Sequence, residues 1–298
     1  MFLDAARQKF PQASLILLLT AVCAVAESSG ADVPPLCQEG YIEPLRRFAD
    51  AFQSARPTLS MIAATLLLLY SGLSLGRAAL RRYLYPAHTL VGIPLAGILV
   101  MGFGLTEWYL SSAVVLTLVC MTLKRLYDCF IVEQPVALIF PAMTALGCTP
   151  LLHAPMTALV VLLIPLLLLC RVPLRSSLAA VVGAVLPTFV VSYAVWAGGG
   201  DFSCDLWHAM LADSDCDMRS YVTVPRLILF GSALFTLTCS MLLYRADKFA
   251  VGVAARKTWS FSIGIVVLLF ALFALLPSVT PLSVSVAAVV SSTLMPMM

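Results

Sequence analysis

The chain has 298 residues, of which 61% are apolar and only 11% are charged. Soluble domains average about 45–50% apolar and about 25% charged residues. A soluble core of this size cannot hide so much apolar surface, because a folded chain needs polar groups to cover it. The composition therefore excludes a soluble enzyme and a disordered chain. The formal net charge of +3 is spread over small clusters, which excludes a basic face for nucleic acid.

Unbroken apolar runs, rather than short alternating segments, predict membrane-spanning helices instead of a closed barrel. A spanning helix needs about 20 mostly apolar residues. We predict an all-α fold, a polytopic transmembrane bundle of about ten helices with short loops that forms a single integral-membrane domain over residues 1–298. The segments lie near 11–28, 58–76, 86–106, 109–123, 136–152, 154–170, 177–198, 225–244, 258–276 and 278–298.

The first segment, 11–28, has two interpretations. Arg7 and Lys9 precede a short apolar run that ends in Ala24-Val25-Ala26, which is typical of a cleavable signal peptide. The alternative is a retained first helix. In both cases the chain from Glu27 onward emerges on the outer side of the membrane, so the remaining topology is the same.

Basic residues gather in alternate connections between the predicted spans. The positive-inside rule then places these connections in the cytoplasm. We therefore expect a multi-pass protein of the bacterial inner membrane with both termini cytoplasmic, provided that the first helix is retained. The basic connections hold Arg7, Lys9, Arg77, Arg81, Arg82, Lys124, Arg125, Arg171, Arg175, Arg245, Lys248, Arg256 and Lys257. The two longest outer loops are exceptions and hold Arg46, Arg47, Arg56, Arg219 and Arg226.

The first outer loop, residues 29–57, contains an amphipathic pattern between Tyr41 and Phe52. Apolar residues recur at helical spacing, and charged residues take the other face. This predicts a helix that lies on the membrane surface as a connector, with its apolar face among the lipid headgroups. A gate or a substrate platform is the functional alternative. The apolar face holds Ile42, Leu45, Phe48, Ala49 and Phe52, and the charged face holds Glu43, Arg46, Arg47 and Asp50.

Acids in this loop resemble those that all-helical, lipid-linked glycosyltransferases place beside an amphipathic helix. A carboxylate base there could activate an acceptor hydroxyl. That resemblance gives an alternative function, for which the weak catalytic candidates are Glu27, Asp32, Glu39 and Glu43. The chain is short for that class and has no large outer domain.

The second outer loop, residues 198–224, carries alternate acids at Asp213, Asp215 and Asp217. This spacing is how a calcium loop begins, but Met218 and Val224 stand where the turn glycine and the bidentate glutamate are needed. We therefore expect a solvated acidic loop, with no bound metal or cofactor. The external cysteines are Cys37, Cys204 and Cys216. Cys204 and Cys216 are the first choice for a disulfide, and Cys37 is the alternative partner.

No acidic, basic or histidine side chain lies near the middle of a predicted span. Ion-coupled transporters normally keep a carboxylate there, so that function is disfavoured. A flippase or carrier for a lipid-like cargo remains an alternative, since prolines in the spans can line a cavity. Two further patterns predict helix contacts. Glycines at 92, 97, 102 and 104 predict close packing, and Ser232, Thr236 and Ser240 predict hydrogen bonds to a neighbouring helix.

The layout resembles a family of multi-pass inner-membrane proteins of Bacteroidota. The similar features are Leu123-Lys124-Arg125-Leu126-Tyr127, the tight hairpin that follows, and Ala254-Ala255-Arg256-Lys257 before a closing hairpin. That family has no established activity, so no catalytic residue is transferred. We expect a non-catalytic structural or accessory component of cell-envelope assembly. Its expected partners are the lipid bilayer and other membrane-protein subunits, and not nucleic acid.

Overall fold

The computed structural model describes residues 10–30, 44–81, 90–105, 108–130, 136–170, 172–199, 223–246, 253–275 and 281–295. Over these ranges the chain is helical and has no strand, which confirms the all-α prediction. The helices up to residue 147 are α2 (Phe10–Gly30), α3 (Pro44–Ala55), α4 (Pro57–Arg81), α5 (Gly92–Phe103), α6 (Tyr109–Cys129) and α7 (Val136–Gly147). They are followed by η1 (Thr149–Leu151), α8 (Met156–Leu169), α9 (Leu174–Ala197), α12 (Val224–Ala246), α13 (Val253–Leu275) and α14 (Pro281–Ser292).

Each of the ten predicted segments contains a helix, but the helices differ in length. Five helices, namely α2, α4, α6, α9 and α12, are long and apolar enough to cross a membrane. Shorter apolar helices of 12 to 14 residues are α5, α7 and α8. Their ends have local causes. Gly104, whose φ of 77° is rarely adopted by other residues, follows α5, and the 3₁₀ turn that contains Pro150 follows α7.

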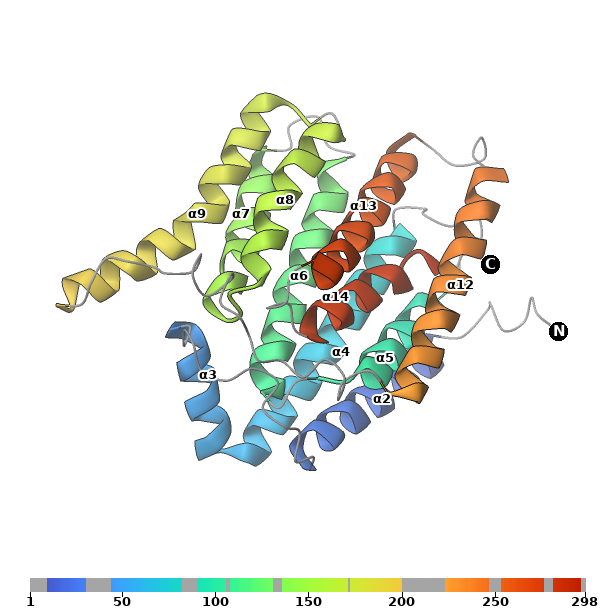
Figure 1. The fold of residues 1–298 in the computed structure, drawn as a ribbon, viewed down its shortest axis with the longest axis horizontal. Coiled ribbons are helices and arrows are strands. Elements are labelled where there is room, and N and C mark those ends of the chain that lie inside the picture. The colour runs from blue at the N-terminus through green and yellow to red at the C-terminus, as the bar shows by residue number, and fades with distance from the viewer. Residues whose placement is uncertain are drawn as a thin grey trace.

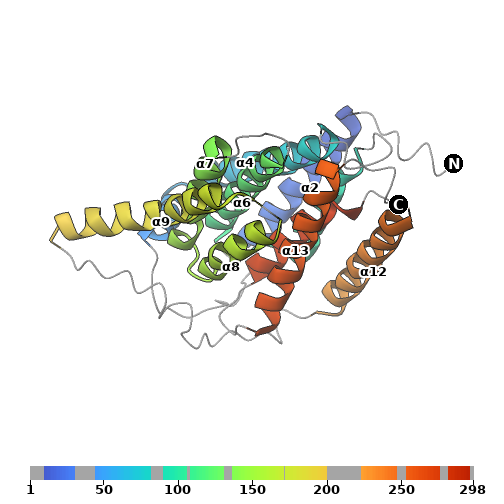
Figure 2. The same ribbon diagram turned by 90° about the horizontal axis from the view of Figure 1, so that it is seen from above.

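Helix α6 occupies the centre of the bundle (Figure 1). It carries more buried residues than any other long apolar helix in the described part, with 72% of its apolar window covered by protein. It packs against α4 on one side and α7 on the other, and α7 in turn packs against α9. Helices α9 and α12 lie at opposite edges of the bundle in both views (Figures 1 and 2).

Helices α7 and α9 approach each other backbone to backbone through glycines. A Cβ atom at Gly147 would collide with the carbonyl oxygen of Ala184, and one at Gly183 would lie 2.7 Å from the carbonyl oxygen of Phe140. The absence of a side chain at both positions lets the two helices come this close, as small residues do between membrane helices. Gly97 of α5 also leaves no room for a Cβ atom, here against the side chain of Thr20 on α2, which confirms the predicted close packing at that position.

The predicted polar stripe on α12 contacts a neighbouring helical segment at only one of its three positions. The Ser240 hydroxyl donates to the carbonyl oxygen of Leu294, just beyond α14. The Ser232 hydroxyl donates instead to the carbonyl oxygen of Leu229 at 2.8 Å, and Thr236 donates to that of Ser232 at 3.0 Å. These two hydroxyls therefore find their hydrogen-bond acceptors on their own helix, as serine and threonine commonly do in apolar helices.

Contacts between distant segments define two ends of the bundle. At the end that we call the basic end, the Arg77 guanidinium lies 4.6 Å from the centroid of the Phe10 ring. The hydroxyls of Tyr127 and Ser262 lie 2.7 Å apart near the same end. The opposite end, which we call the α3 end, holds α3, the first turn of α6 and the turn between α7 and α8. Described cations of the basic end are Arg77, Lys124, Arg125, Arg175, Arg256 and Lys257, and those of the α3 end are Arg46, Arg47, Arg56 and Arg226.

Candidate functional site

The polar side chains of the α3 end gather beneath α3. Its half-buried residues recur at Arg46, Ala49, Asp50 and Gln53, which is the spacing of one helix face. Its large apolar residues, Leu45, Phe48 and Phe52, are exposed, with Phe48 at 77%. The helix is therefore turned so that its polar face meets protein and its apolar face is left for the surroundings, as expected beside lipid. A helix with the predicted amphipathic pattern is confirmed over Pro44–Ala55, and the protein contact of its polar face is a new finding.

One hydrogen bond attaches this polar face of α3 to the start of α6, and a second joins the start of α6 to α4. The Gln53 side-chain oxygen accepts from the backbone N–H of Leu110 at 3.2 Å. Leu110 lies in the first turn of α6, where backbone N–H groups have no acceptor within the helix. The Tyr109 hydroxyl reaches the carbonyl oxygen of Pro57, at the start of α4, at 3.4 Å. Gln53 thus caps α6 from outside and fixes α3 against it.

Arg46 joins the remaining polar groups of this site. Its Nε lies 3.3 Å from Asp50 Oδ2, one helical turn further on. Its charge also acts on His153, in the turn between η1 and α8. The backbone N–H of His153 donates to the carbonyl oxygen of Thr149 at 2.9 Å, so the backbone of the turn is held in place.

His153 is only 9% exposed. Burial, followed by the nearby Arg46 charge, lowers the pKa of its imidazole from 6.5 to about 3. The imidazole is therefore neutral at physiological pH, because both desolvation and a neighbouring cation disfavour the charged form. The site has a carboxylate, a guanidinium and a neutral imidazole, and its chemistry is that of a polar contact between helices.

Most residues singled out from the sequence lie outside the described part of the chain. This applies to Asp32, Glu39, Glu43, Asp213, Asp215, Asp217, Cys37, Cys204 and Cys216. Glu27 is described and is exposed near the end of α2. Over the described ranges, no group of three or more His, Cys, Asp or Glu side chains is placed to hold a metal ion.

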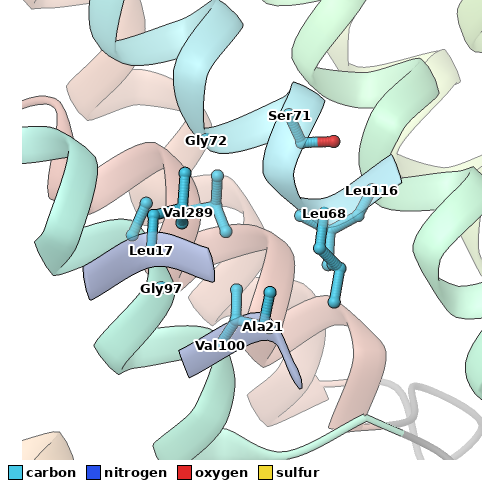
Figure 3. A pocket seen from close by; sticks show the side chains of 10 residues that line it. Leu17, Ala21, Leu68, Ser71, Gly72, Gly97, Val100, Leu116 and Val289 are labelled. Carbon is cyan, nitrogen blue, oxygen red and sulfur yellow. The ribbon is translucent and has the colours of Figure 1, made fainter. Parts of the chain in front are cut away.

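A small cavity lies inside the bundle between α2, α4, α5, α6 and α14 (Figure 3). Its free volume is about 10 Å³, about the space that one water molecule needs. Its walls are apolar apart from Ser71, whose hydroxyl lies 2.9 Å from that of Thr117. This cavity is far too small for the lipid-like cargo of the carrier alternative.

The lateral surfaces of α9 and α12 are the most exposed apolar regions among the long helices described. Protein covers only 22% of the apolar window of α9 and 11% of that of α12. The C-terminal part of α9 leaves the bundle and projects sideways (Figure 1). This part carries Phe189, Tyr193 and Trp196, each more than half exposed.

Sequence reasoning missed the position of α3 on the bundle, the burial of His153 and the low coverage of α12 by protein. A signal existed for the first, since Arg46, Asp50 and Gln53 follow helical spacing and so form one polar face. No signal existed for α12, because its composition is that of an ordinary span. Comparisons of the chain with protein-family models, curated proteins and solved structures found no match in any of the three.

Proposed function

We propose that this chain is a non-catalytic, multi-pass protein of the bacterial inner membrane that serves cell-envelope assembly by holding partner transmembrane helices. The observation that supports this proposal is the uncovered apolar surface of α12, together with that of α9. A peripheral helix of a bundle normally buries one face against its neighbours. Since α12 buries only 11% of its apolar window, most of its surface is open for another helix.

A glycine on α12 gives the second argument. Several glycines of the other helices, including Gly72, Gly76, Gly102 and Gly264, would each place a Cβ atom in collision with a neighbouring side chain. A Cβ atom at Gly231 would meet nothing within 4 Å. A helix glycine without a close neighbour costs backbone entropy and gains no packing. A partner helix seated on Gly231 would supply that packing, as small residues do between membrane helices.

Site-specific photocrosslinking in cells tests this proposal. A benzophenone amino acid replaces Phe235, which is 66% exposed on α12, and in a matched control it replaces Leu66, which is 57% exposed on α4. We expect a discrete adduct with one other membrane protein from position 235 and not from position 66. Adducts to lipid alone at both positions would overturn the proposal, because the surface of α12 would then be an ordinary lipid contact.

The basic end supports the orientation that we propose for the chain. Described cations are more numerous at the basic end than at the α3 end, and the positive-inside rule places such an end in the cytoplasm. A green fluorescent protein fused after Met298 folds only in the cytoplasm, so we expect it to fluoresce. A dark fusion of the full-length, membrane-inserted chain would contradict a cytoplasmic C-terminus.

A further inference from the structure

Two aromatic rings stack between α12 and α13 at the basic end. The rings of Tyr244 and Trp259 have centroids 4.3 Å apart and are parallel to within 1°. Arg256 lies one turn before Trp259 on the same face of α13, and its charge acts on the Tyr244 hydroxyl. Tyr244, Arg256 and Trp259 therefore line one seam between the two helices, and we call it the α12–α13 seam.

Two hydrogen-bond donors in this seam are buried without an acceptor among the described residues. Trp259 is fully buried, and no described residue accepts from its Nε1–H. The Nε–H of Arg256 is also buried and has no acceptor in the described part of the chain. Burying a donor without an acceptor is unfavourable, and more so when the donor is charged. Two such donors in one seam indicate that a missing acceptor belongs there.

The surroundings favour an anionic acceptor. Arg256 and Lys257 lie in the first turns of α13, where the helix dipole is positive, and Lys124, Arg125 and Arg175 lie at the same end of the bundle. Asp128 of α6 is the described acid at this end. A phosphate group has several acceptor oxygens and forms strong charge-assisted hydrogen bonds with a guanidinium, whereas a zwitterionic headgroup adds a cation that the basic end repels.

The position of the seam also indicates the source of the phosphate. Tyr244 lies near the end of α12, directly after Leu242 and Leu243, which are 66% and 45% exposed. A lipid could lay its acyl chains along this apolar surface while its headgroup enters the seam. Basic pockets between membrane helices bind anionic lipids in this way. We propose that the α12–α13 seam binds the phosphodiester of an anionic phospholipid headgroup.

This inference needs only a membrane-embedded chain and not the partner helix proposed above. Native mass spectrometry of the full-length protein, released from detergent with a range of lipid concentrations, measures lipid binding directly. The probes are phosphatidylglycerol, phosphatidylcholine with the same acyl chains, and inorganic phosphate. We expect one phosphatidylglycerol molecule to be retained at concentrations where phosphatidylcholine is lost. Equal retention of both lipids would overturn the proposal. Retention of inorganic phosphate at the concentration at which phosphatidylglycerol saturates the protein would overturn it as well.

Variants locate the binding site. Arg256→Gln removes the charge and should weaken phosphatidylglycerol binding about tenfold, which corresponds to the loss of a charged hydrogen bond. Arg175→Gln removes an exposed cation at the same end and is the matched control, so its binding should stay unchanged. Arg256→Lys keeps the charge and should restore part of the affinity. An equal loss in Arg256→Gln and Arg175→Gln would place the lipid elsewhere on the basic end and overturn the proposal.

Discussion

The contact between α7 and α9 and the outer face of α12 both carry glycines, but in opposite surroundings. At Gly147 and Gly183 the backbones of two helices touch, whereas Gly231 faces open space. Helices α9 and α12 have similar mean hydropathy, so hydropathy does not separate the two regions. What separates them is contact with protein, since lipid tails and protein interiors are equally apolar solvents for a side chain. In this chain, the surroundings of a glycine say more about helix packing than hydropathy does.

The largest effect on stability is expected at Gly147, in the contact between α7 and α9. Gly147→Ala places a methyl group against the carbonyl oxygen of Ala184, and a backbone atom cannot move aside as a side chain can. We expect a loss of about 3 kcal/mol in the free energy of unfolding, typical of overpacking. Unfolding in mixed detergent micelles measures it.

Gly231→Ala is the matched control on α12. It adds the same methyl group where nothing lies within 4 Å. In the isolated protein we expect a gain of about 0.5–1 kcal/mol, because alanine loses less backbone entropy in a helix than glycine does. Similar losses in Gly147→Ala and Gly231→Ala would remove the distinction between the two regions.

An intermediate effect is expected from pH at the α3 end. The pKa of His153 is about 3 in the folded protein, below its ordinary value of 6.5, so below pH 6.5 the unfolded state binds a proton that the folded state does not. The free energy of unfolding therefore has its full value above pH 6.5 and decreases as the pH falls from 6.5 toward 3. Each pH unit in this window should cost up to about 1.4 kcal/mol.

Unfolding measured between pH 7.5 and pH 5 tests the prediction for His153. The variant His153→Gln cannot titrate, so its stability should depend less on pH over that range than that of the original protein. An identical pH dependence in both proteins would show that the imidazole is accessible and protonated in the folded state.

The smallest effect is expected at the cap of α6. Gln53→Ala leaves the N–H of Leu110 without its side-chain acceptor, and the loss of a cap costs about 1 kcal/mol. Hydrogen exchange should become faster at the first turn of α6 and in α3. Ser54→Ala is the control, because the Ser54 hydroxyl is bonded within α3, to the carbonyl oxygen of Asp50. Faster exchange in both variants would mean that α3 is loosened generally rather than released from α6.

Hydropathy predicted where helices form and the amphipathic pattern predicted α3, because both depend on the local sequence. Helix ends were predicted less well. Helix α6 continues to Cys129, beyond the expected end at 123, because Lys124 and Arg125 are good helix formers although they are not apolar. The exposure of α12 and the burial of His153 depend on neighbours far away in the chain. The polar stripe on α12 does not indicate which side of the helix meets protein, because the Ser232 and Thr236 hydroxyls donate to carbonyl oxygens of their own helix.

The contact between α7 and α9 also has a consequence for biosynthesis. The face of α7 that carries Gly147 packs against α9. Helix α8 lies between α7 and α9 in the chain. The ribosome therefore releases α7 into the membrane before its main partner has been made. Until α9 is inserted, Gly147 faces lipid or the insertion machinery, and a nascent chain that stalls after α8 exposes this face to capture by the wrong helix.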